Sequence, residues 1–303
     1  MRQRYSNKRS TGDVADVVAL LDDRLDDELV RLASSNLPTR GEAVAVDWKQ
    51  RAIEQWTADP CGPRVSGAEA LLRARRAYAP WMPSALDYEG AAGLDVLDVG
   101  CGQGIDLCEY ARAGARVTGI DLTPRHVELA RQHLAELGLV GAAVVEGDAE
   151  RLPFPDESFD LVSSNGVLHH TPDMVGALKE IRRVLRQDGR LTVIVYNRRS
   201  AHYWLHQVLL RGIVQAGLVR EGGMAGVLSA HVERSTVGAR PLVRALTASQ
   251  LRAMLHQAGF GVASVEPTPF QPHETLFTKK LTRVPPFPVG WYLIGRARRD
   301  GGE

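Results

Sequence analysis

The stretch VLDVGCGQGIDLCEYA, residues 96–111, decides the fold. It is typical of a short apolar strand that ends at Val99, a turn with three glycines, and a helix that begins near Ile105. Glycines are needed in such a turn because a side chain would block the close approach of the backbone to a ligand, and because the turn requires unusual φ angles. The amino end of the following helix presents free N–H groups and positive potential to an anion. We therefore predict a ligand-binding unit here.

Around this unit, short apolar runs alternate with helical ones. The runs from residue 94 on are LDVLDV, ARVTGI, AAVVE, FDLVSS and RLTVIVY. Alternation of this kind is typical of a parallel sheet whose two faces are covered by helices. Two further strands are expected at about 260–266 and 290–297. We predict an α/β fold: a Rossmann-like, doubly wound, mainly parallel seven-stranded sheet with helices on both faces, preceded by N-terminal helices and interrupted by a helical insertion after strand five.

The predicted organisation has five segments. They are a disordered basic terminus (1–12), an N-terminal helical segment (13–80), the core (81–197), a helical insertion (198–245), and a C-terminal helix with the last two strands (246–303). Within the N-terminal segment, helical spacing of apolar residues indicates helices at about 13–35, 47–58 and 66–79. The C-terminal helix has a capping residue at Thr247 and ends at Gly259.

Composition limits the functional classes. The formal charge of +1 gives no basic excess for a nucleic-acid partner. The three cysteines form no CxxC pair, which indicates a reducing compartment and predicts no metal site. No run of eighteen apolar residues occurs, so we expect a cytoplasmic protein without a membrane span. The oligomeric state stays open, a homodimer included.

The ends of the next two strands carry side chains suited to a nucleoside. Asp121 ends the second strand, seventeen positions after Gly104, where a carboxylate can accept hydrogen bonds from both hydroxyls of a ribose. Asp148 and Ala149 follow the third strand, beside the place that an adenine would occupy. The carboxyl ends of parallel strands meet at one edge of a sheet, so these residues are expected to lie together.

The fourth strand adds polar residues to the same edge. Its end, SSNGVLHHTPD at 163–173, contains Asn165, Gly166, His169 and His170. Four successive strand ends therefore converge on one crevice, as expected for a ligand site in a doubly wound sheet.

These motifs resemble those of a known enzyme family. VLDVGCGQG, VTGIDLTP, EGDAERLPFPDESFD and SSNGVLHHTPD, followed by EIRRVLRQDGRLTV, are similar in kind and order to the motifs of class I S-adenosylmethionine-dependent methyltransferases, especially the ubiquinone/menaquinone-biosynthesis type (methyltransferase type 11). The similarity covers about residues 94–196. It implies a methyltransferase that uses S-adenosylmethionine, releases S-adenosylhomocysteine, and methylates an O, N or C atom of a small molecule in specialised-metabolite or quinone biosynthesis.

The resemblance also assigns roles to individual residues. The segment EQWTADPCG at 54–62 resembles a stretch that closes over the pocket in some bacterial members. The implied contacts are Asp98, Gly100, Cys101 and Gly102 to the methionine part, Asp121 and Leu122 to the ribose, Asp148 and Ala149 to the adenine, and Asn165 and Gly166 under the sulfonium.

Methyl transfer from a sulfonium mainly requires alignment and the exclusion of water. If the acceptor is a hydroxyl or an acidic carbon, a base is also needed, and His170 is the first candidate. His169, His202, Tyr203 and His206 are further candidates. The insertion is expected to build the acceptor pocket, with side chains that could line an apolar cavity or form the buried stripe of an ordinary helix: Tyr203, Trp204, Leu205, Leu209 and Leu210.

Other interpretations stay open at this point. The glycine turn could be purely structural, Asp148 could cap the following turn, Cys101 could be a small filler, and either histidine could pack in the core. An NAD(P)-dependent oxidoreductase shares the fold, but its loop is GxGxxG, whereas this one is GxGxG. A scaffold that binds the cofactor without catalysis is the third alternative.

Overall fold

The computed structural model describes residues 41–233, 235–261, 263–269 and 289–300, with side chains from Trp48 on. The chain divides into two units, Met1–Val44 and Ala45–Glu303, and the second contains the sheet. The terminus predicted at 1–12 and the helix predicted at 13–35 lie outside the described residues. Within the described ranges, no helix combines the length and apolar character that crossing a membrane requires.

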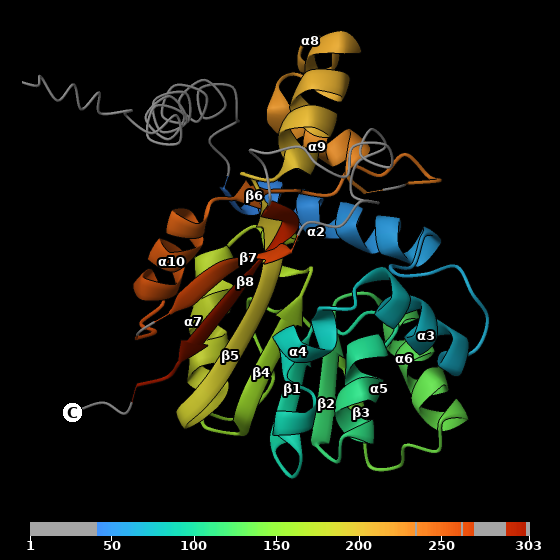
Figure 1. The fold of residues 1–303 in the computed structure, drawn as a ribbon, viewed down its shortest axis with the longest axis vertical. Coiled ribbons are helices and arrows are strands. Elements are labelled where there is room, and N and C mark those ends of the chain that lie inside the picture. Colours follow the sequence, from blue (N-terminus) through green and yellow to red (C-terminus); the bar gives the residue numbers. More distant parts are fainter. Residues whose placement is uncertain (1–40, 234, 262, 270–288, 301–303) are drawn as a thin grey trace, which may run out of the picture. The chain divides into compact units, whose positions relative to one another are not determined.

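The centre of the second unit is a sheet whose main strands run in the order β3-β2-β1-β4-β5-β8-β7 (Figure 1). The pairs among β1 to β5 are parallel, whereas β8 is antiparallel to both β5 and β7. The strands are β1 (Asp95–Val99), β2 (Arg116–Asp121), β3 (Ala143–Glu146), β4 (Phe159–Asn165), β5 (Leu185–Asn197), β6 (Ala245–Leu246), β7 (Ser264–Pro269) and β8 (Val289–Arg298). The predicted fold class is confirmed, with one added short strand, β6, beside β5.

The strand order places the binding crevice. The chain proceeds outward from β1 to β3 and then returns to β4 on the other side of β1. The connections after β1 and β4 therefore leave the sheet in opposite directions, and a crevice opens between them at the carboxyl ends of these strands. The glycine turn follows β1 and the segment with the paired histidines follows β4, so both lie at this switch point.

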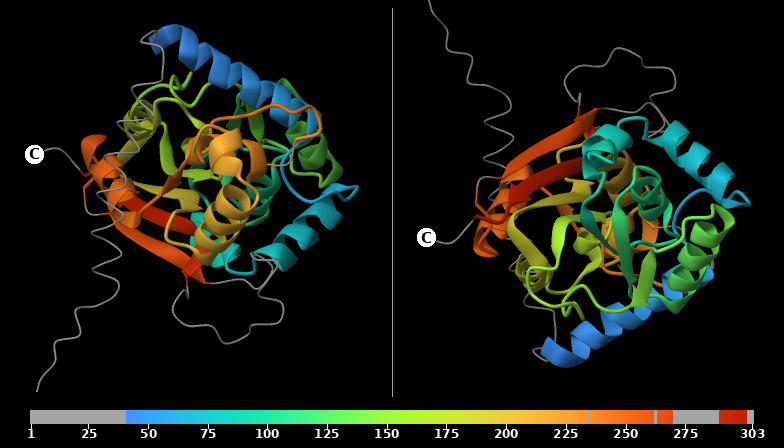
Figure 2. Two further views of the ribbon diagram at one scale, coloured as in Figure 1. Left: turned by 90° about the horizontal axis from the view of Figure 1, so that it is seen from above. Right: turned by 90° about the horizontal axis from the view of Figure 1, so that it is seen from below.

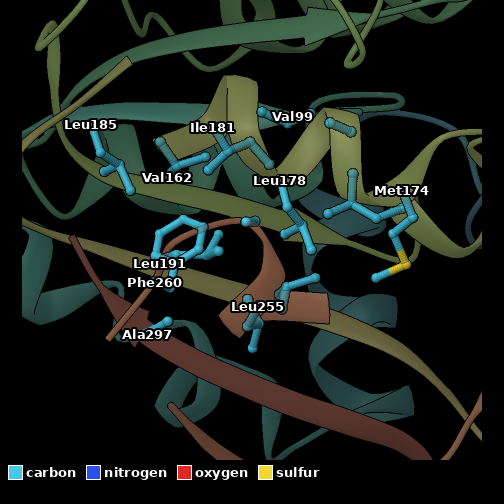
Figure 3. Close-up of a cluster of buried hydrophobic side chains, with 14 of the residues drawn as sticks. Val99, Val162, Met174, Leu178, Ile181, Leu185, Leu191, Leu255, Phe260 and Ala297 are labelled. Carbon is cyan, nitrogen blue, oxygen red and sulfur yellow. The ribbon is translucent and has the colours of Figure 1, made fainter. Parts of the chain in front are cut away.

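Helices cover both faces of the sheet. One buried cluster joins α7 (Met174–Val184) and α10 (Ala248–Gln257) to the sheet; Figure 3 shows Leu178, Ile181 and Leu255 in it. The cluster on the other face joins α3 (Ala68–Tyr78), α4 (Met82–Leu86), α5 (Ile105–Arg112) and α6 (Pro124–Glu136) to β1 and β2. Burial of these apolar stripes on both faces explains why the strands are near-continuous apolar runs.

The remaining elements lie at the carboxyl end of the central strands. They are α2 (Gly41–Ala58) and the insertion, which contains a π-helix (His202–Val214), α8 (Gly217–Arg220) and α9 (Met224–His231). Figure 1 shows α8 and α9 above the sheet, and in the left view of Figure 2, which is seen from above, the insertion helices lie in front of it. Short 3-10 turns occur at Glu89–Ala91 and Leu168–His170.

Two strand boundaries differ from the prediction. The run RLTVIVY predicted a strand from Arg190, but β5 begins at Leu185, which pairs with Phe159 of β4. The backbone is irregular between these two points, where Asp188 has a φ of 62°. β7 begins at Ser264, whereas the prediction began at 260. Phe260 supplies a core side chain from the connection that follows α10, so its apolar character reflects packing and not a strand.

A capping box stabilises the amino end of α10. The Thr247 hydroxyl accepts a hydrogen bond from Gln250 N at 3.2 Å, and Gln250 Oε1 accepts one from Thr247 N at 2.9 Å, which completes a capping box. Thr247→Ala should lower the free energy of unfolding by about 1 kcal/mol, because it leaves a helix N–H without its partner. Urea denaturation of this variant and of Thr247→Ser, which keeps the hydroxyl, measures the effect; equal losses in the two would contradict it.

Candidate functional site

A cavity of about 680 Å³ opens at the carboxyl ends of β1, β2, β3 and β4. Most of the predicted binding residues line it: Gly100, Gly102, Asp121, Leu122, Asp148, Ala149, Asn165, Gly166 and His170. Asp98, Cys101 and His169 are buried near it but do not belong to its lining. The residues of the four strand ends therefore converge on one cavity as expected, while three of the predicted residues lie behind its wall.

The glycine turn has a backbone that other residues would strain. Gly100, Gly102 and Gly104 have φ values of 74°, 53° and 79°. The N–H groups of Gly100 and Cys101 both donate to the Ile120 carbonyl, at 2.7 and 3.1 Å, which fastens the turn to β2. A Cβ at Gly100 would lie 2.2 Å from a methyl carbon of Val167. The turn thus brings bare backbone to the cavity, as the sequence predicted.

Asp121 holds the turn from the end of β2. Its Oδ2 accepts from Gly102 N at 2.8 Å, and its Oδ1 accepts from Thr123 N at 2.9 Å and lies 3.2 Å from His126 Nδ1. Burial raises the pKa of Asp121, but the contacts with His126, Thr123 and Gly102 outweigh it and hold the pKa below its ordinary value. The carboxylate is therefore charged and fixed in place beside the cavity.

His126 was missed by the sequence reasoning. Burial lowers its pKa, but the facing Cys61 sulfur and the Asp121 carboxylate outweigh this and raise the pKa to about 10. The signal in the sequence is its position in the first turn of α6, five residues after Asp121, from which a side chain can reach back to the strand end.

Asp148 is held from two directions. Its Oδ1 accepts from Glu150 N at 2.9 Å, which is the turn-capping contact left open by the sequence, and its Oδ2 lies 2.6 Å from Lys49 Nζ. Lys49, Ala52 and Trp56 lie on one face of α2 and line the cavity together. Lys49 also contacts Glu150. Nothing in the sequence pattern connected Lys49 to this site.

A second buried charge cluster lies behind β1 and β4. Arg75 of α3 lines the cavity, and its Nη2 lies 3.3 Å from Asp106 Oδ2, which also accepts from Asn165 Nδ2 at 2.8 Å. Burial and the carboxylates of Asp106 and Asp121 raise the pKa of Asp98, while Arg75 lowers it. Arg75 was also missed by the sequence reasoning, and it brings a guanidinium to the lining of the cavity.

His170 forms the wall at the end of β4. Its Nδ1 lies 2.6 Å from the Leu242 carbonyl, which can only accept, so this nitrogen carries the proton in the neutral ring. Its Nε2 lies 3.6 Å from Glu233 Oε1, and Tyr196 donates to that same oxygen at 2.5 Å. Burial lowers the pKa of His170 against the opposing effect of Glu233, which favours the neutral base form.

His169 differs from its neighbour. It is 0% exposed, and its ring lies 4.1 Å from that of Tyr196. Neither of its ring nitrogens has a hydrogen-bond partner among the described residues. Burial lowers its pKa well below the ordinary value. His169 therefore has the surroundings of a core residue, and the candidate role for it is not supported by its position.

The candidates in the insertion lie outside the cavity lining. Tyr203 is buried in a small cluster with Leu228, Val243 and Trp291, which corresponds to the buried-stripe alternative. The other residues not found among the lining are His202, Trp204, Leu205, His206, Leu209 and Leu210. The insertion reaches the cavity through Glu233, after α9, which the sequence reasoning did not identify.

The segment after α2 covers the glycine turn. Cys61, Gly62 and Pro63 line the cavity, and Trp56, near the end of α2 itself, contacts His170 edge-on with ring centroids 5.0 Å apart. Asp59 accepts a hydrogen bond from Thr236 N and thereby connects this segment to the insertion. These contacts place part of the segment 54–62 at the cavity; that it closes over the pocket stays a prediction.

The arrangement defines a Rossmann-like domain in which a glycine turn and a strand-end acid border one cavity. Residues 97–193 match the family model described as methyltransferase domain. The resemblance drawn from the sequence motifs is thereby confirmed for this part of the chain.

Two curated relatives and one solved structure are similar to the chain. A demethylmenaquinone methyltransferase of Tropheryma whipplei is 38% identical over 120 residues, which cover 39% of this chain and 49% of the relative. A ubiquinone biosynthesis O-methyltransferase of Actinobacillus pleuropneumoniae is 36% identical over 132 residues, or 41% of this chain and 56% of the relative. An S-adenosylmethionine-dependent methyltransferase of Mesorhizobium loti has a TM-score of 0.52 at 18% identity, covering 77% of this chain and 100% of its own.

The chain spans about half the length of these curated relatives. The likeness to the Mesorhizobium loti structure shows the shared fold.

Proposed function

We propose that this chain transfers a methyl group from S-adenosylmethionine to a small-molecule acceptor. The observation that carries the proposal is the fixed Asp121 carboxylate, which lies between bare glycine backbone and the cavity. A ribose offers two neighbouring hydroxyl donors, and a charged carboxylate with lone pairs at the cavity is the partner they require. The ordered motifs of residues 97–193 support the same conclusion.

The residues present fit the cofactor along the whole rim. Asp121 and Leu122 would hold the ribose, and Asp148 with Ala149 would border the adenine. The glycine turn, shaped from behind by Asp98 and Cys101, would hold the methionine part, with Asn165 and Gly166 beside the sulfonium. Arg75, which lines the cavity, would supply a cation for the methionine carboxylate. The bound sulfonium supplies an electrophilic methyl carbon; the protein supplies alignment and a covered cavity.

Binding measurements separate this proposal from its rivals. Calorimetry with the whole chain should show binding of S-adenosylhomocysteine and none of NADH; the reverse would favour an oxidoreductase. A scaffold without catalysis would bind the cofactor tightly and release no labelled methyl to any member of an acceptor panel. The names of the relatives favour a ring-bearing acceptor such as a quinone precursor, and the aromatic side chains of the cavity are suited to a ring.

His170 is the proposed general base. Its Nδ1 is held by a backbone carbonyl, so its basic Nε2 is oriented, and burial keeps the ring neutral. His170→Ala should lower kcat by about 10²- to 10⁴-fold and leave the affinity for S-adenosylhomocysteine within about twofold. Steady-state kinetics and calorimetry check this, with His256→Ala on the exposed face of α10 as the control. Unchanged kcat would remove His170 from the mechanism.

A further inference from the structure

Most of the charged side chains at the cavity have a partner of opposite charge, but Glu233 does not among the described residues. Asp121 lies beside His126, and Asp148 beside Lys49. Arg75 lies beside Asp106. Glu233 differs: among the residues that the structure describes, it contacts the Tyr196 hydroxyl and the neutral ring of His170, and no lysine or arginine pairs with it. Within the described part of the chain, the end of the cavity at His170 therefore carries a carboxylate without a basic partner, which is costly in a half-buried place unless a ligand brings the counter-charge.

Glu233 and His170 also form a specific hydrogen-bonding arrangement. Both the carboxylate oxygen and the Nε2 of the neutral ring are acceptors, and they lie 3.6 Å apart. Among the described residues, the Tyr196 hydroxyl donates to the Glu233 oxygen, whereas no group donates to His170 Nε2, since the Nδ1 proton is directed at the Leu242 carbonyl. A single hydroxyl group has one hydrogen and satisfies one of the two acceptors. A protonated amine has at least two N–H bonds and satisfies both.

Aromatic side chains border the same end of the cavity. Trp56, Tyr78, Tyr196 and Tyr292 all line it. The Tyr196 and Tyr292 ring centroids are 5.8 Å apart, and the Trp56 ring is in edge contact with His170. Aromatic faces attract a desolvated cation, and rings combined with a carboxylate are a recurring surrounding for ammonium groups.

We propose that the acceptor is a primary or secondary amine, bound as its ammonium ion between Glu233, His170 and the aromatic wall, and that the chain is an N-methyltransferase. This rests on the proposed function. A proton passes from the ammonium nitrogen to His170 Nε2, which frees the nitrogen lone pair. That lone pair forms the N–C bond to the methyl carbon while the C–S bond breaks and its electron pair stays on sulfur. The Glu233 carboxylate stabilises the resulting imidazolium until its proton is released to water.

Binding of a matched pair of probes tests the cation site without turnover. In the complex with S-adenosylhomocysteine, 2-phenylethylamine should bind at least 10-fold more tightly than 2-phenylethanol by calorimetry. Glu233→Gln should remove the difference. Glu266→Gln on the exposed surface of β7 should retain it. Equal affinities of the two probes in the native chain, or failure of both to bind, would overturn the proposal.

Kinetics and product analysis complete the test. With an accepted amine, Glu233→Gln should raise the amine KM at least 10-fold and leave the affinity for S-adenosylhomocysteine unchanged. A loss of that affinity would assign Glu233 to the cofactor and overturn the proposal. Mass spectrometry of products from a panel with equal numbers of amines and hydroxyl compounds should show N-methyl products; O- or C-methyl products would overturn the amine assignment while supporting methyl transfer. Absence of S-adenosylhomocysteine binding to the native chain would overturn the proposed function itself.

Discussion

Replacement of Asp121 by alanine is expected to reduce the affinity for S-adenosylhomocysteine by at least about 100-fold. The carboxylate would accept from two ribose hydroxyls, and hydrogen bonds to a charged group contribute about 1.5–3 kcal/mol each. It also accepts from the N–H groups of Gly102 and Thr123, so its removal releases the glycine turn. Calorimetry measures the loss; an unchanged affinity would contradict the placement of the ribose. Asp121→Asn, which keeps one acceptor oxygen, should lose less.

The same substitution should destabilise the protein. Asp121→Ala leaves the buried His126 without its carboxylate, and breaking a buried pair from one side costs roughly 3–5 kcal/mol. The contributions of Asp121 and His126 to folding stability depend on pH in opposite directions. Because the pKa of Asp121 is below its ordinary 3.8, its contribution is present above that pH and is lost in acid. Because the pKa of His126 is raised from 6.5 to about 10, its contribution is complete below 6.5 and lost as the pH rises through 10. The stability difference between native chain and variant should therefore be largest at mildly acidic pH.

The second large effect is expected at Gly100. Gly100→Ala places a Cβ at 2.2 Å from Val167 Cγ2 on a backbone with φ of 74°, so either the turn or the segment after β4 must move. We expect a stability loss of about 3 kcal/mol or more and loss of S-adenosylhomocysteine binding.

Gly93 provides a matched control for this variant. Its φ is 75°, and a Cβ there meets nothing within 4 Å. Gly93→Ala should therefore cost only the conformational penalty, about 1–2 kcal/mol. Urea denaturation of both variants separates crowding from backbone strain. Addition of Val167→Ala to Gly100→Ala should recover part of the loss; equal stabilities of the two glycine variants would show that the close approach to Val167 carries no weight.

The residues that the sequence located correctly are those fixed by local geometry. A strand end, a glycine turn and a helix start are determined over a few neighbouring residues, so Gly100, Asp121, Asp148 and Asn165 could be placed at one edge from the strand pattern alone. Thr247 was found for the same reason, because a capping box is a contact between residues three apart.

The residues that were missed depend on long-range packing. Lys49 meets Asp148 across 99 positions, and Arg75 meets Asp106 across 31. Glu233 reaches Tyr196 across 37. No periodicity links such pairs. The positions of α2, α3 and the insertion depend on complementary surfaces, and the sequence pattern does not show which surfaces pack together.

The sequence also could not show which of two neighbouring side chains faces the cavity. His169 and His170 are consecutive in a 3-10 turn, where successive side chains point about 120° apart. Only His170 therefore reaches the cavity. Asp98 and Cys101 are likewise next to lining residues in the sequence, but they are buried and do not line the cavity. The motif therefore predicted more cavity-lining residues than the structure contains.

A crystal structure of the whole chain with S-adenosylhomocysteine is the most direct test of the account. We predict that the adenosyl group lies across the carboxyl ends of β1 to β4, with both ribose hydroxyls within hydrogen-bond distance of Asp121 and the homocysteine sulfur facing the wall formed by His170 and Glu233. The ligand bound elsewhere, or a ribose without contact to Asp121, would contradict it.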